Sequence, residues 1–275
     1  MLDKERLDEL LAYYVSKFPG VANTPLHHEM LKWRAVAYCK KRFDIEEVDF
    51  GAMLKDAFSV WRSLIDYGGV TPLTAIVKLC EKGYGEDVRR AFRDLLKDDG
   101  AEPLDERWNR IIAFRDRINE LREEAKLGGW RYKCDHRCVM MILGFLRPET
   151  DYMFKSMPAV DFALYTHFNK YIGAGKKFRL DNYYLLCEEL IDELHKRSAI
   201  LDMIHKVIQK EAAESGFEPV LSVDTKNHIA VYDVIYVTAM YGFWTCLIYL
   251  LQVRSRTLRK IFRWHVYSLK NTTMI

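Results

Sequence analysis

Apolar residues recur every three or four positions along most of this chain, which is the spacing of one face of an α-helix. The pattern runs through residues 2–18, 27–43, 49–65 and 104–129. Thr71-Pro72 has the N-cap and first-turn arrangement that begins another helix. A short amphipathic helix is expected over 86–100, closed by a turn at its C-terminal end. The first half of the chain is therefore predicted to be helical.

The second half has a more mixed pattern. A buried helix is expected over 136–149, ending before Pro148, and another over 159–173. The longest helical run extends from Asn182 to about Ala213, whereas 151–155 and 217–233 have extended, strand-like or loop-like composition. Together, the patterns of the two halves predict a mainly α, multi-helix domain with a few short strands or extended segments in its second half. Its expected parts are subdomains 1–128 and 129–233 and an apolar, basic tail over 234–275.

The tail raises a separate question. Residues 234–253 form a run of 20 residues without Asp, Glu, Lys or Arg, and four basic residues follow within 254–260. Such a run is long enough to cross the ~30 Å of hydrocarbon in a bilayer. Thr238 and Gln252 within it favour a buried or irregular tail instead. A membrane anchor at 234–253, a buried segment and an out-of-frame or truncated ending all stay open.

Composition is that of an ordinary globular protein, with 49% hydrophobic and 29% charged residues. The net charge of +3 is uneven, because residues 240–275 carry six basic groups and no acids. The first 239 residues are nearly neutral, which gives no reason to expect a strongly basic nucleic-acid binder. The charged, helical start is unlike a signal peptide, so a cytoplasmic protein with reduced cysteines is expected.

Three short motifs suggest chemistry, and each has a plainer interpretation. Cys134 and Cys138 lack the second ligand pair that a zinc site needs, and their apolar surroundings predict core cysteines. The glycines around 173–175 do not have the spacing of a phosphate-binding loop and predict a turn. Glu124 and Lys126 resemble part of a nuclease motif but lie on an amphipathic helix. The sequence therefore predicts no catalytic site, no metal site and no cofactor.

Several stretches nevertheless resemble a known family. They are "HEMLKWRAVAYCKKRFDIEEVDFGAMLKDAFS" at 28–59, "VRRAFRDLL" at 88–96, "RCVMMILGFLRPETDYMFKSMPAVDFA" at 137–163 and "NYYLLCEELIDEL" at 182–194. Together they resemble the N-terminal region that precedes the ATPase module in McrB-like AAA+ restriction proteins of bacteria, over about residues 5–239. The chain departs from that family, because it contains no Walker motif. A truncated member that lacks the ATPase module would show the same departure.

The resemblance implies a non-catalytic recognition or regulatory module of a bacterial restriction or defence system. Its implied partners are DNA, or an ATPase or nuclease subunit of such a system. A protein–protein interaction module and a membrane-attached protein are the alternatives. If DNA is bound, basic side chains would contact phosphates and aromatic rings would receive an extruded base. The candidates for these two roles are Lys40, Lys41, Arg42, Lys176, Lys177 and Arg179, and Tyr152 and Phe154.

Overall fold

A computed structural model describes residues 1–24, 28–66, 69–97, 102–215 and 223–241. The protein is mainly helical, as predicted. Its α-helices are α1 (Lys4–Val21), α2 (Leu31–Arg42), α3 (Phe50–Ala57), α4 (Pro72–Leu79), α5 (Gly85–Leu95), α6 (Leu104–Glu124), α7 (His136–Leu146), α8 (Ser156–Tyr165), α9 (Leu180–Lys196), α10 (Ser198–Ser215) and α11 (His228–Met240). Short 3-10 turns lie at Arg62–Leu64, Trp130–Tyr132 and Gly175–Lys177.

The predicted short strands are wrong for the part of the chain that the structure describes, which contains no β-strand. Residues 151–155 are neither helical nor paired in a sheet. Within 217–233, the segment from His228 onward forms the start of α11. This segment lacks a polar face, because Ile229 to Ile235 are buried. A helix that is buried on every side has no amphipathic period for a sequence pattern to detect.

The predicted long helix from Asn182 to Ala213 is two helices that meet at Arg197. The backbone of Arg197 leaves the helical region, with φ −114° and ψ 54°. Its guanidinium donates to Asp8 of α1 at 2.6 Å, so a contact between distant parts of the chain accompanies the break. The predicted helix over 159–173 is also shorter than expected, because α8 ends at Tyr165.

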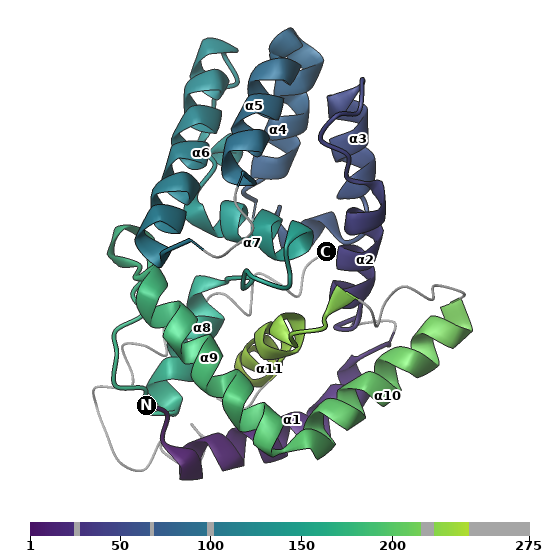
Figure 1. Cartoon of the computed structure of the whole chain (residues 1–275), viewed down its shortest axis with the longest axis vertical. Helices are drawn as coiled ribbons and strands as arrows, with labels where there is room; N and C mark the ends of the chain where they lie inside the picture. Colours follow the sequence, from purple (N-terminus) through teal and green to yellow (C-terminus); the bar gives the residue numbers. More distant parts are fainter. Residues whose placement is uncertain (25–27, 67–68, 98–101, 216–222, 242–275) are drawn as a thin grey trace.

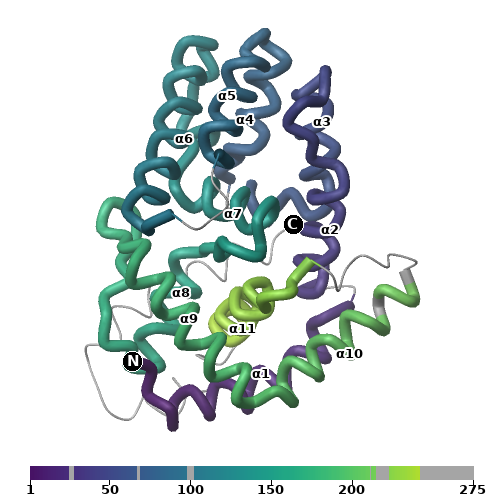
Figure 2. Tube along the Cα trace, in the orientation of Figure 1, coloured from purple at the N-terminus to yellow at the C-terminus, as the bar shows by residue number. Residues whose placement is uncertain are grey.

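The helices form two groups, one at each end of the molecule, and helix α7 lies between the two groups. In Figure 1, α4, α5 and α6 run side by side at one end, and α1, α8, α9, α10 and α11 make the other. Helix α7 lies between them and packs against both α2 and α6 (Figure 2). The buried apolar residues of both ends belong to one hydrophobic cluster, from Leu7 to Val237. The division into subdomains at 128–129 stays a prediction.

Helix α11 occupies the middle of its end and packs against α1, α8 and α9. Its Asp233 is fully buried and forms an ion pair with Lys32 of α2, which also pairs with Glu29. The hydroxyl of Tyr14 on α1 donates to Asp233 at 2.7 Å. A buried charge is tolerated only where partners compensate it, so this cluster holds α1, α2 and α11 in one arrangement.

The start of the predicted tail lies within this core. Residues 234–240 are the C-terminal half of α11, and Val234 and Val237 are fully buried. Among the described residues, no helix combines the length and apolar character needed to cross a membrane. Of the candidate anchor at 234–253, only 234–241 is described, and the remaining residues lie outside the described part of the structure.

Candidate ligand-binding groove

An open groove of about 460 Å³ lies between α5 and α6, and we call it the α5–α6 groove. The residues that line it lie three, four or seven positions apart on each helix, so each set shares one face. Ala91 on α5 and Ala113 on α6 are small, which leaves space between the helices. The lining is Asp87, Arg90, Ala91, Asp94, Leu95, Lys97, Arg110, Ala113, Phe114 and Arg117.

Charged side chains border the groove over an apolar floor. Leu95 and Phe114 are buried beneath it, whereas four basic and two acidic residues stand along its length. At one end Arg117 of α6 forms an ion pair with Asp87 of α5 at 3.1 Å. The other end contains Arg110, next to Leu95 at the end of α5. The two helices are thus antiparallel, and each end of the groove contains an arginine paired with a carboxylate.

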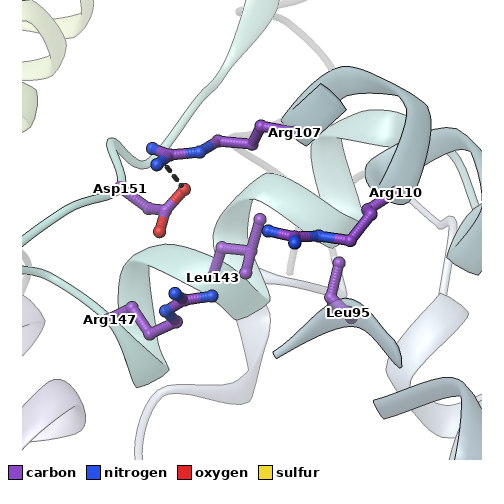
Figure 3. A pocket seen from close by; sticks show the side chains of 6 residues that line it. All are labelled: Leu95, Arg107, Arg110, Leu143, Arg147 and Asp151. Carbon is purple, nitrogen blue, oxygen red and sulfur yellow. Dashed lines mark hydrogen bonds and ion pairs between the residues drawn. The ribbon is translucent and has the colours of Figure 1, made fainter. Parts of the chain in front are cut away.

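A smaller hollow adjoins the groove at the Arg110 end. This arginine hollow is lined by Leu95, Arg107, Arg110, Leu143, Arg147 and Asp151 (Figure 3). It shares Leu95 and Arg110 with the groove. Its side chains leave no room for even one water molecule, so the hollow cannot enclose a ligand.

Buried carboxylates fix the arginines of the hollow. Arg107 forms an ion pair with Asp151 at 3.3 Å, and its Nη1 also donates to the backbone oxygen of Thr150 at 2.9 Å. Glu102 lies 3.7 Å from Arg107 and also pairs with Arg110. These contacts hold the guanidinium groups in set positions, which favours recognition of a shaped anion.

The pKa values of two arginines of the hollow, Arg107 and Arg110, are shifted in opposite directions. Burial alone would lower the pKa of Arg107, but the Asp151 carboxylate raises it above its ordinary value. For Arg110 the direction is opposite, because burial and then the positive charge of Arg147 lower its pKa. Figure 3 shows the guanidinium groups of Arg110 and Arg147 converging near Leu143. Two like charges held near each other favour an anion between them.

The basic residues predicted from the sequence lie elsewhere and form two separate surfaces. Lys40 and Arg42, at the end of α2, pair with Glu149 and with Asp56, the latter at 3.4 Å. Lys41 is exposed beside them. These three residues therefore present less free positive charge than the sequence suggests.

The second predicted surface lies around the 3-10 turn at Gly175–Lys177. Lys176 and Lys177 are exposed there. Arg179 forms an ion pair with Asp181 at 3.3 Å, where both side chains are more than half exposed. An exposed pair of this kind contributes little to stability.

The predicted base-receiving aromatics are buried. Tyr152 is 2% exposed and stacks on His228 with ring centroids 4.0 Å apart. Phe154 is fully buried between Phe178 and Tyr183, at 4.2 and 4.8 Å. Neither ring offers a face to an extruded base, so both are packing residues in this structure.

The prediction of core cysteines is confirmed for the "CDHRC" motif. Cys134 is fully buried and Cys138 is 3% exposed. In the described ranges, no three His, Cys, Asp or Glu side chains come together as a metal-ion site. Asn119 of α6 instead binds the backbone of Cys134 in both directions, at 2.9 and 3.1 Å. The motif therefore joins the start of α7 to α6.

The basic residues of the groove were not among the sequence candidates. Arg90, Lys97, Arg110 and Arg117 are dispersed along amphipathic helices, where charged residues usually form a solvated face. The available signal was the pair of alanines, Ala91 and Ala113, among long charged side chains. The pairing of the two helices was needed to interpret it.

Comparison of the chain with protein-family models, with curated proteins and with solved structures finds no match.

Proposed function

We propose that this chain is a cytoplasmic, non-catalytic recognition module of a bacterial restriction or defence system, and that it binds an acidic segment of a partner protein in the α5–α6 groove. The observation that carries the proposal is the groove itself, with about 460 Å³ of space, an apolar floor and an excess of basic side chains. Ligand sites in proteins commonly have this size and this combination of apolar floor and few polar groups.

The charges of the groove favour an acidic segment. Its lining carries four basic and two acidic side chains, and among the basic ones Arg90 and Lys97 are exposed to an acidic ligand. The two acidic residues supply discrimination, because a misplaced carboxylate would lie against Asp87 or Asp94. The apolar floor favours a segment that also carries small or aliphatic side chains.

The partner that this proposal implies is an ATPase or nuclease subunit of the system. The resemblance to the N-terminal region of McrB-like proteins supports that choice. In such a system the module recognises a signal and separate subunits carry out hydrolysis and cleavage. The groove supplies the contact between them.

Charge reversal in the groove tests the proposal. Fluorescence anisotropy would measure binding of a fluorescein-labelled peptide of glutamate, leucine and serine to the full chain. Arg90 and Lys97 are exposed, so reversing them should leave the fold intact. The double variant Arg90→Glu/Lys97→Glu should bind roughly tenfold more weakly.

The matched control reverses two charges outside the groove. Lys41→Glu/Lys176→Glu makes the same change in net charge at exposed positions. It should bind the peptide as the unchanged protein does. Equal losses in both double variants, or absence of binding by the unchanged protein, would contradict the proposal.

DNA binding is a second candidate, supported by a different surface. Lys41, Lys176 and Lys177 are exposed and have no ion-pair partner among the described residues. Phosphate contacts release counterions, so affinity for a DNA duplex should fall as salt rises. Substituting the three lysines with alanine should reduce the salt slope, and Arg90→Glu/Lys97→Glu should not. Unchanged slope in the lysine variant would contradict this candidate.

A further inference from the structure

The loop between α8 and α9, residues 166–179, contains positively charged side chains and no acidic ones, and we call it the lysine loop. It has four basic residues and no Asp or Glu. Three of the four are exposed and have no ion-pair partner among the described residues: Lys170, Lys176 and Lys177. The loop therefore presents three lysines to an anionic ligand.

The acidic side chains next to the lysine loop have other partners. Asp181, which follows the loop in α9, pairs with Arg179 at 3.3 Å. Asp3 caps α1 and lies 3.6 Å from His167, and Glu189 lies 3.5 Å from the N-terminal amino group. None of these three carboxylates is paired with a lysine of the loop, so the lysines can still contact an anion.

An exposed aromatic ring lies beside these lysines. Tyr171 is 65% exposed, and among the described residues its ring has no stacking or cation–π partner. A Cβ placed on Gly173 would lie 3.0 Å from Cε1 of Tyr171 and would clash with the backbone oxygen of Lys177. The Tyr171 ring and the Lys177 backbone therefore meet at Gly173, which lacks the side chain that would separate them.

The lysine loop has a defined shape before any ligand binds. The backbone nitrogen of Arg179 donates to the backbone oxygen of Ile172 at 2.9 Å. Ile172 and Phe178 are 3% and 5% exposed, so both ends of this turn are anchored in the core. Gly173 and Gly175 have φ of +69° and +55°, a conformation that glycine adopts without strain. A loop held in this way loses less entropy when it binds a ligand.

We propose that the lysine loop binds single-stranded nucleic acid, with its lysines on the phosphates and one base stacked on the ring of Tyr171. The inference rests on the second candidate function, DNA binding, and names the form of nucleic acid that this surface accepts. A base of a single strand has a free face for the ring, whereas the bases of a duplex stack on one another. Aromatic stacking and phosphate contacts are together the usual means by which proteins bind single strands of any sequence.

An anionic membrane surface would also attract the lysines, but the loop does not suit it. Segments that bind at a membrane surface bury several large apolar side chains among the lipid headgroups. Within the lysine loop, Tyr171 is the one large apolar side chain that is exposed, because Phe168, Ile172 and Phe178 are buried. A single ring beside lysines suits a base between phosphates better than it suits a lipid layer.

Two strands that differ only in their bases test the inference. Fluorescence anisotropy would give the Kd of the full chain for a labelled oligothymidylate of about 12 nucleotides and for an abasic strand of the same length. Both strands carry the same phosphates, so the basic residues within 254–270 attract them alike. The oligothymidylate should bind roughly tenfold more tightly than the abasic strand, because only it supplies a base for stacking.

Matched aromatic variants locate the stacked base. Tyr171→Ala should bring the ratio of abasic to oligothymidylate Kd to near one, and Tyr171→Trp should preserve it. Trp130→Ala removes a ring that is equally exposed, at 65%, on the 3-10 turn that packs against α4. The guanidinium of Arg131 already lies over that ring, 5.9 Å from its centroid, so this control should leave the ratio unchanged.

A lysine variant tests the phosphate contacts separately. Phosphate contacts release counterions, and each contact with a single strand contributes about 0.7 to the slope of log affinity against log salt. Replacing Lys170, Lys176 and Lys177 with alanine should therefore reduce that slope by about 2 for the oligothymidylate. The ring of Tyr171 carries no charge, so Tyr171→Ala should leave the slope unchanged.

The outcomes separate this inference from the DNA candidate on which it rests. If the lysine variant weakens duplex binding but Tyr171→Ala leaves the strand ratio unchanged, the stacking site is wrong and the DNA candidate stands. If neither strand nor duplex binds, both fail. Oligouridylate should respond to Tyr171→Ala as oligothymidylate does, and a response of only one of them would contradict stacking. Phosphatidylserine vesicles whose binding depends on Tyr171 and which displace the oligothymidylate would assign the loop to a membrane instead.

Discussion

Helices α5 and α11 both carry charged residues, but they use them in opposite ways. Helix α11 is buried on all sides, and its Asp233 is enclosed with Lys32 and Glu29. Helix α5 buries only one face, through residues such as Phe92, and its Arg90 is 73% exposed beside the groove. The comparison shows that burial, rather than residue type, determines whether a charged residue stabilises this fold or remains available to a ligand.

The largest effect is expected where the α11 cluster loses Lys32, the cation that pairs with both Glu29 and Asp233. Substituting Lys32 with methionine leaves Glu29 and Asp233 buried together without a compensating charge. The cost should be about 3–5 kcal/mol of unfolding free energy, measured by urea denaturation. Asp233→Asn leaves Lys32 paired with Glu29 and should cost less than half as much. Equal costs in the two variants would show that charge balance does not control this cluster.

A substitution at the junction of the two ends should have the next largest effect. Gly144 in α7 faces Met153, and an added Cβ would lie 2.5 Å from the Met153 Cγ. Gly144→Ala should therefore destabilise the protein by about 1–3 kcal/mol through overpacking. The same change at Gly85 meets no atom within 4 Å at the start of α5.

Because Gly85 has helical φ and ψ of −54° and −44°, Gly85→Ala should stabilise the protein by about 0.4–1 kcal/mol. Urea denaturation of both alanine variants measures the contrast. Destabilisation of similar size at the two positions would contradict the difference in packing between α7 and the start of α5.

His136 and Asp233 should affect the pH dependence of stability in opposite directions. Burial lowers the pKa of His136 to about 4, so its contribution to stability is lost as pH falls from 6.5 toward 4. Burial and the nearby Glu29 raise the pKa of Asp233 to about 6, despite Lys32. Its contribution is therefore present at low pH and is lost as pH rises through 6. The two groups have opposite effects over the same range.

Variants at each position make this opposition measurable. His136 stacks on Phe178, with ring centroids 4.9 Å apart, so His136→Phe preserves the ring contact. This variant should gain stability relative to the unchanged protein as pH falls from 6.5 to 4, and Asp233→Asn should lose it. Thermal unfolding at several pH values measures both. Parallel pH profiles for the two variants would contradict the assignment.

The smallest effect on stability is expected in the groove. Arg90 and Asp87 lie 4.0 Å apart, and their side chains are 73% and 36% exposed, so their attraction is screened by water. Arg90→Ala should change the unfolding free energy by less than about 0.5 kcal/mol. Urea denaturation in parallel with the Lys32 variant gives the contrast directly. A loss of several kcal/mol would mean that the groove charges belong to the fold.

The sequence located some helices correctly and missed others, and their surroundings explain the difference. Helices with clear boundary residues were located well, including α4, which begins at Pro72 after Thr71, and α7, which ends before Pro148. Their caps and periodicity depend on neighbouring residues only. Helix α11 was missed because its surroundings are apolar throughout and its β-branched residues suggest a strand.

Features that depend on distant residues were also missed. The break at Arg197 accompanies a contact with Asp8, which lies 189 positions away. The α5–α6 groove depends on the pairing of α5 with α6, because this pairing brings Ala91 and Ala113 together in its lining. Neither arrangement leaves a local signal. The basic triplet at 40–42 was conspicuous in the sequence, yet the fold pairs Lys40 with Glu149 and Arg42 with Asp56.

A reciprocal exchange of charge tests most directly whether the α5–α6 groove is the binding surface. The unchanged protein and the variant Arg90→Glu/Lys97→Glu would each be titrated with a glutamate-rich peptide and with the same peptide carrying lysine instead. The groove account predicts that the unchanged protein prefers the glutamate peptide and that the variant prefers the lysine peptide. A variant that keeps the preference of the unchanged protein would contradict the account, because the peptide would then bind elsewhere.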